Sequence, residues 1–280
     1  MNPAGLLKIQ TVTMCIICQG DYDEKMTVLD CSNCLLISNI PDTLVNLTLL
    51  YCYNCPLLTH IPDTLVNLTT LYCSDCPLIT HIPDTLVNLT TLYCYKCPLI
   101  THIPDTLTSL TTLTCHNCPL LTHIPDTLTS LTTLYCSDCP RLTHIPDTLT
   151  SLTYLYFYDC PLITHIPDTL TSLTTLNCLD CPLLTHIPDT LTSLTHLSCY
   201  DCPFLNHPRN PLGKTNMSNL IALQRYIRRR VLANRIEKIG KSRDLIELWW
   251  HPDAKGGWLA KREIAAEVGE VEGFLSDFST

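Results

Sequence analysis

Two adjoining stretches of the sequence decide the fold. Residues 68–88 read LTTLYCSDCPLITHIPDTLVN, and residues 89–109, which follow directly, read LTTLYCYKCPLITHIPDTLTS. The same cycle can be followed from residue 26 to residue 207, so one unit of 21 residues recurs along most of the chain. Repetition at a fixed period of this length predicts a solenoid, in which short coils stack because no single coil can bury its own apolar side.

The repeat predicts nine rungs and the inward side of each. Strand positions return at Cys31, Cys52, Cys73, Cys94, Cys115, Cys136, Phe157, Cys178 and Cys199. In the third rung we expect the inward side chains to be Leu71, Cys73, Cys76 and Leu78, with Ile82, Leu86 and Leu89 closing the coil from the other side. A cycle of 21 residues leaves little room for an α-helix, and its prolines fix φ at the bends, so turns or 3₁₀ segments are expected opposite the strands.

The pattern L-x-x-L-x-C-x-x-C-P-L resembles the leucine-rich repeat signature. Cys73 stands at its third apolar position and Cys76 at its Asn/Cys position, and the following I-P-x-x-L is similar to the convex half of short repeats in that family. The resemblance implies a curved stack of parallel strands whose concave face typically binds other proteins. The expected fold class is therefore a β-rich solenoid of short parallel strands with a turn or 3₁₀ convex side, followed by a small α-helical C-terminal region.

The composition limits the classes of protein to which this chain could belong. The chain has 280 residues, 46% of them hydrophobic and only 15% charged, which excludes a disordered polar chain. The 19 cysteines are odd in number, residues 1–11 have no signal-like apolar core, and no apolar run is long enough for a membrane span, so we expect an intracellular, cytoplasmic protein with reduced thiols. With only 8 glycines and no catalytic constellation apart from the repeat columns, we expect a protein that is not an enzyme.

The cysteines form two columns. They can be interpreted either as residues that pack in the core or as metal ligands. Seventeen thiols fall in register, and one rung carries Phe157 in place of the first cysteine. We favour packing, because the first cysteine occupies an apolar position and the second replaces the Asn that satisfies backbone groups between coils.

The outward positions of the strands predict a binding face. Tyr/Thr/Ser columns with an acidic column beside them suit protein contact, since tyrosine offers a large area at a low cost in entropy. The alternative is that aromatic and β-branched residues simply favour strands. The candidate partner-binding residues are Tyr51, Tyr53, Tyr72, Asp75, Tyr93, Tyr95, Tyr135, Asp138, Tyr156, Tyr158, Asp159, Tyr200 and Asp201.

The N-terminal segment, residues 1–25, is predicted to cap the solenoid, with a strand over residues 8–17. Its Cys15 and Cys18, together with Cys31 and Cys34, have the spacing C-x2-C-x12-C-x2-C, which is typical of zinc ribbons. CIICQGDYDEKMTVLDC also resembles the opening of a RING finger, although Asn33 stands where that family has histidine. Two hypotheses follow: a plain thiol-lined cap, or a zinc site in a ubiquitin-pathway adaptor or ligase. No other cofactor is expected.

The C-terminal segment, residues 208–280, is predicted to be a linker followed by a basic helical domain. Residues 1–205 carry 4 Lys/Arg against 17 Asp/Glu, whereas residues 206–280 carry 13 against 9. The basic helix, residues 216–239, would cap the solenoid or meet an acidic partner; nucleic acid is disfavoured because the solenoid is acidic. RYIRRR followed by WWHPDAKGGWLAKREI is similar to tails of repeat proteins of giant DNA viruses, which implies a host or viral protein as partner.

Overall fold

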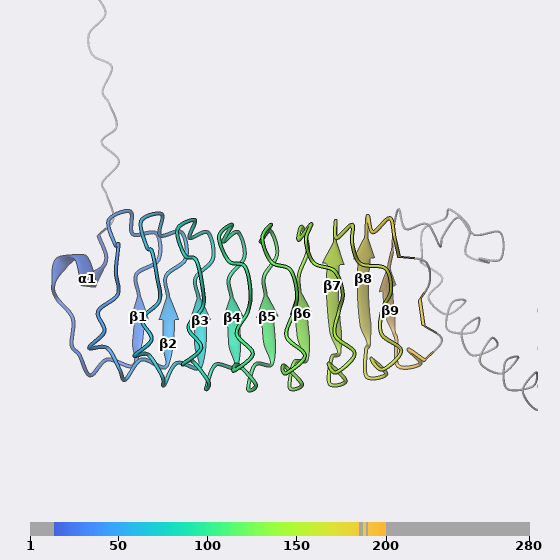
Figure 1. The fold of residues 1–280 in the computed structure, drawn as a ribbon. Coiled ribbons are helices and arrows are strands. Elements are labelled where there is room, and N and C mark those ends of the chain that lie inside the picture. Colours follow the sequence, from blue (N-terminus) through green and yellow to red (C-terminus); the bar gives the residue numbers. More distant parts are fainter. Residues whose placement is uncertain (1–13, 185–186, 189, 200–280) are drawn as a thin grey trace, which may run out of the picture. The chain divides into compact units, whose positions relative to one another are not determined.

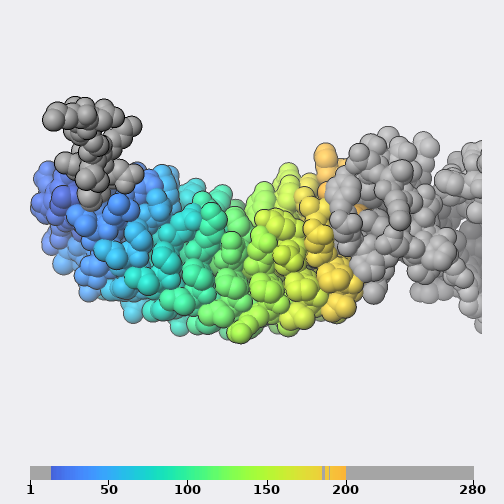
Figure 2. Space-filling view, turned by 90° about the horizontal axis from the view of Figure 1, so that it is seen from above, coloured from blue at the N-terminus to red at the C-terminus, as the bar shows by residue number. Residues whose placement is uncertain are grey.

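The computed structural model describes residues 14–184, 187–188 and 190–199. Within them a short helix, α1 (Ile16–Gln19), precedes a nine-stranded parallel sheet in which the strands follow one another in chain order (Figure 1). The strands are β1 (Val28–Asp30), β2 (Leu49–Tyr51), β3 (Thr70–Tyr72), β4 (Thr91–Tyr93), β5 (Thr112–Thr114), β6 (Thr133–Tyr135), β7 (Tyr154–Tyr158), β8 (Thr175–Leu179) and β9 (His196–Ser198). The predicted solenoid of parallel strands is confirmed, and its stacked rungs curve gently (Figure 2).

Register along the sheet is set by the period of the sequence. Each strand residue pairs with the residue 21 positions later, as Leu71 does with Leu92. The ladder continues past the strands, where the Cys73 N–H donates to the Tyr93 carbonyl at 2.8 Å. Because identical side chains face one another in successive rungs, the buried columns merge into one continuous core.

The core contains most of the predicted inward residues. Leu71, Cys73, Cys76, Ile82, Leu86 and Leu89 are each 0–1% exposed. The prediction for Leu78 is wrong, because that side chain is 41% exposed and Ile79 is buried in its place. The Ile79 N–H donates to the Cys76 carbonyl at 3.3 Å, and this tight turn brings residue 79, rather than residue 78, to the inside.

Turns form the side of the coil opposite the strands. The Leu86 N–H donates to the Pro83 carbonyl at 3.4 Å, and the Leu89 N–H to the Leu86 carbonyl at 3.0 Å. The turn alternative is therefore confirmed, and the described residues contain no 3₁₀ helix. A threonine in each turn also bonds to the previous rung, as Thr85 Oγ1 does to the Asp63 carbonyl at 2.7 Å, so polar side chains tie the rungs together.

The N-terminal cap differs from the prediction. Ile16 and Ile17, which we expected at the end of a capping strand, lie in helix α1, and Gly20 ends the helix with φ 72°. Such a positive φ suits glycine, which lacks a Cβ. The first part of the predicted strand, residues 8–13, lies outside the described residues.

The C-terminal predictions also fall outside the described residues. These are the linker and the basic helical domain of residues 208–280, together with Tyr200 and Asp201. Among the residues that the structure describes, no helix is long and apolar enough to cross a membrane.

Candidate partner-binding face and thiol cluster

The strand face, which we define as the outward side chains of β1 to β9, contains two tyrosine stacks. Tyr51, Tyr72 and Tyr93 stack with ring centroids 4.8 and 4.6 Å apart. Tyr135 and Tyr156 stack at 4.5 Å. Parallel strands lie about 4.8 Å apart, so tyrosines in register stack at the spacing of the sheet itself. All five side chains are half-buried, so the rings are packed against their neighbours and remain partly accessible.

Thr114 separates the two stacks. It occupies the tyrosine position in β5, is 6% exposed, and its buried Oγ1 has no hydrogen-bond partner. Burial and the adjacent rings raise the pKa of Tyr72 and of Tyr135. These hydroxyls therefore remain neutral near pH 7 and can donate hydrogen bonds to a partner.

A second outward column contains both large and small side chains. Tyr53 and Tyr158 are 40% and 42% exposed, and Tyr95 stacks on the ring of His116 at 4.6 Å. Ser74, at the position between Tyr53 and Tyr95, is 2% exposed, so this column is not exposed throughout.

The acidic column beside these tyrosines has a backbone role. Asp75, Asp138 and Asp159 adopt φ values of 50–54°, and their equivalents in the other described rungs adopt values of 50–59°. Asp and Asn tolerate this left-handed conformation better than other non-glycine residues, which explains why they recur there. Lys96 is the exception, and it forms an ion pair with Asp75 at 3.4 Å. The carboxylates are thus placed by the turn, and a contribution to binding would come in addition to that role.

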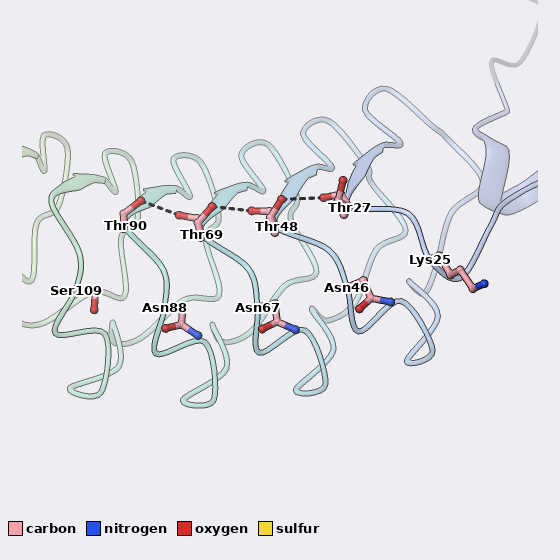
Figure 3. Close-up of a pocket in the computed structure, with 9 residues that line it drawn as sticks. All are labelled: Lys25, Thr27, Asn46, Thr48, Asn67, Thr69, Asn88, Thr90 and Ser109. Atoms are coloured by element: carbon pink, nitrogen blue, oxygen red, sulfur yellow. Dashed lines mark hydrogen bonds between the residues drawn. The ribbon is translucent and has the colours of Figure 1, made fainter.

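A shallow groove of about 890 Å³ was not anticipated from the sequence. It is lined by a threonine ladder and an asparagine row (Figure 3), namely Thr27, Thr48, Thr69, Thr90, Asn46, Asn67 and Asn88, with Lys25 and Ser109 at its ends. Most of its donors are used within the fold: Thr69 Oγ1 donates to the Thr48 carbonyl at 3.0 Å, and Asn67 Nδ2 to the Val45 carbonyl at 2.9 Å. The groove is therefore better explained as part of the bonding between rungs. The change from Asn88 to Ser109 in the repeat is the sequence signal that marks its end.

The cysteine columns bond and pack as expected. Cys76 Sγ donates to the Cys52 carbonyl of the preceding rung at 3.0 Å, and Cys97 Sγ to the Cys73 carbonyl at 3.1 Å. Burial raises the pKa of Cys52 well above its ordinary value, which keeps this thiol protonated. The second cysteine thus replaces an Asn-type donor, which supports the packing interpretation.

Three of the four predicted metal-ligating cysteines come together. The Sγ atoms of Cys15, Cys18 and Cys34 all lie within 4.8 Å of one another, and we call them the thiol cluster. Cys31 is not part of the cluster, because its buried Sγ donates to the Tyr51 carbonyl at 3.4 Å as a member of the first rung.

The three thiols of the cluster differ in pKa. Burial and hydrogen bonds with the other two thiols raise the pKa of Cys18 to about 12, and burial raises the pKa of Cys15. Burial also acts on Cys34, but N–H groups of Cys15 and Leu36 donate to its sulfur and lower its pKa overall. Of the three thiols, Cys34 therefore loses its proton most readily.

The rate of modification by a maleimide should distinguish the cysteines of the thiol cluster from the cysteines of the two columns. In chelator-treated, folded protein we expect a maleimide to modify Cys15 and Cys18, which are half-buried, before the buried cysteines of the rungs. Because only thiolates react and the pKa of both residues is raised, the rate should keep rising above pH 9. Peptide mapping at timed intervals would measure this, and early modification of Cys94 or Cys115 would contradict it.

Comparisons with known proteins agree with this geometry. Five segments match the family model "Leucine Rich Repeat", at residues 46–68, 67–89, 109–131, 130–152 and 151–173. These five segments therefore match leucine-rich repeats, and the described part of the chain is a solenoid of parallel strands similar to leucine-rich repeat domains. Such solenoids are typical protein-interaction domains and are generally non-enzymatic. Among curated proteins, no match was found.

Several solved structures are similar. The Arabidopsis receptor kinase HAESA, solved with the peptide hormone IDA and the co-receptor SERK1, is 27% identical with a TM-score of 0.52; the match covers 64% of this chain and 35% of HAESA. The leucine-rich repeat domain of the type III effector XopL is 20% identical with a TM-score of 0.56, covering 66% and 74%. InlJ from Listeria monocytogenes, described as including a cysteine ladder, is 20% identical with a TM-score of 0.37, covering 68% and 61%. This chain thus spans about a third of the length of the HAESA chain.

Proposed function

We propose that this protein is a non-enzymatic scaffold that binds a protein partner through the strand face. The observation that carries the proposal is the pair of tyrosine stacks, Tyr51–Tyr72–Tyr93 and Tyr135–Tyr156, displayed on neighbouring strands. Tyrosine is favoured at interfaces because its amphipathic ring gives a large contact area while losing little conformational entropy. Here the stacking has already fixed the rings, so binding would cost still less.

The charge of the face indicates the kind of partner. Asp75, Asp138 and Asp159 accompany the tyrosines, and Lys96 is the one cation among the eight described non-glycine residues with positive φ. A protein partner with basic or hydrogen-bond-accepting groups opposite these side chains would therefore fit best. The resemblance of the tail to repeat proteins of giant DNA viruses leads us to propose a host or viral protein as that partner, met in the cytoplasm.

Affinity capture with matched variants tests the face. The face variant combines Tyr72→Ser, Tyr135→Ser and Tyr156→Ser. The control variant combines Leu78→Ser, Leu99→Ser and Leu162→Ser, which are 39–44% exposed at the bend after the strands. We expect a partner recovered by wild type and control to be reduced more than about tenfold with the face variant, because interface tyrosines are frequent hot spots. Equal recovery by all three proteins would refute the proposal.

The ubiquitin-pathway alternative has less support. A RING-type module needs further ligand pairs, and within the described residues the thiol cluster is the only group of three or more potential metal ligands. We therefore treat metal binding at the cluster as a separate question from ubiquitin transfer.

A further inference from the structure

The thiol cluster has the dimensions of a metal centre. Zinc binds thiolate sulfur at about 2.3 Å in tetrahedral geometry, which places neighbouring sulfurs about 3.8 Å apart. The Cys15 and Cys18 Sγ atoms are 3.7 Å apart, and the Cys18 and Cys34 Sγ atoms are 3.5 Å apart. All three Sγ atoms lie within 4.8 Å of one another, so a single ion could contact them together.

Cys34 also bonds differently from the other cysteines of its column. In the following rung, Cys55 Sγ is a donor, to the Cys31 carbonyl at 3.1 Å. Cys34 belongs to the first rung and has no earlier rung to donate to; its sulfur instead accepts the N–H of Cys15 at 3.4 Å. At this position the sulfur therefore accepts a backbone N–H and contacts the Cys18 thiol, instead of donating to a preceding rung.

We propose that Cys15, Cys18 and Cys34 bind one zinc ion and that this ion fastens the N-terminal turn to the first rung of the solenoid. Thiolate ligands select soft metals such as zinc. Cys15 is the N-cap residue of α1 and Cys18 lies within the helix; both are half-buried, which leaves an entry path, while the buried Cys34 anchors the site to the rung. The ion would thus close the end of the repeat stack.

The site has three protein ligands, and we assign the fourth position to water. Within the described residues no Cys, His, Asp or Glu joins the three thiols. Residues 1–13 contain none of these residue types. Three protein ligands and one water is the arrangement known from catalytic zinc sites, whereas structural zinc sites usually have four protein ligands.

Metal titration of the full chain tests the proposal. Protein purified under reducing conditions and stripped with a chelator should take up one Co²⁺, with sulfur-to-cobalt charge-transfer bands, and Zn²⁺ should displace it. Zinc should also raise the melting temperature, because it binds the folded state. X-ray absorption of the zinc form should show three sulfurs and one oxygen.

Matched variants test which cysteines ligate the metal. Cys18→Ser, at a half-buried site outside the rungs, should weaken Co²⁺ binding more than about tenfold while circular dichroism still shows a folded chain. Cys31→Ser and Cys97→Ser, which alter rung cysteines, should leave the bands unchanged. No metal uptake by folded wild type, unchanged binding by Cys18→Ser, loss of the bands in folded Cys31→Ser, or four sulfurs around zinc would each overturn the assignment.

Discussion

Replacing Phe157 with alanine is expected to lower the free energy of unfolding by about 3–5 kcal/mol, the range for large aromatic residues in a core. Phe157 lies in the middle rungs, on strand β7, and is fully buried. It pairs with Cys178 of the next rung, in a column that is otherwise made of thiols. Its removal would leave a cavity that the close-packed neighbouring rungs cannot fill by small shifts.

The adjacent residue provides the control. Tyr156 points to the opposite side of the same strand, is half-buried, and stacks on Tyr135. Tyr156→Ala should therefore cost less than Phe157→Ala, because it removes a ring that is only half-buried and an aromatic contact worth about 0.5–1.5 kcal/mol beyond its buried area. Equilibrium unfolding in urea would measure both variants. Similar losses for the two would contradict the inward and outward assignments of β7.

Replacing Ile79 with alanine is expected to cost about 2–5 kcal/mol, whereas Leu78→Ala should change stability by no more than about 0.5 kcal/mol. The two residues are neighbours in sequence and similar in volume, but Ile79 is 0% exposed and Leu78 is 41% exposed. The pair can be compared by urea unfolding under identical conditions. A larger loss for Leu78→Ala would show that the turn after Cys76 is oriented the other way.

The sequence predicted the fold well because the period of 21 fixes the register of every strand. Because Leu71 and Leu92 are equivalent positions of the repeat, their strands pair in parallel and both side chains point into the same core. The error at Leu78 arose where the alternation of inward and outward side chains along the strand ends. From there on, the geometry of a turn decides which side chain is buried. A signal was present: Arg141 stands in the column of Leu78 in a later rung, and an unpaired arginine is rarely buried.

The candidate site could be predicted only in part. The tyrosine columns followed from strand alternation, but their division at Thr114 and the burial of Ser74 depend on side-chain size in adjacent rungs. The carboxylates of Asp75 and Asp138 were interpreted as binding groups, whereas the positive φ of both residues gives them a backbone role that spacing alone does not reveal. Likewise, spacing proposed Cys31 as a ligand, and only the fold separates it from the thiol cluster.

The binding of a partner by the strand face is tested most directly by site-specific photocrosslinking. A photoreactive phenylalanine analogue would be placed at Tyr93, on the strand face, or at Leu99, 39% exposed at the bend that follows in the same rung. Irradiation in cells should produce a crosslinked protein adduct from position 93, identifiable by mass spectrometry, and none of that species from position 99. The same adduct from position 99, with none from position 93, would contradict the account.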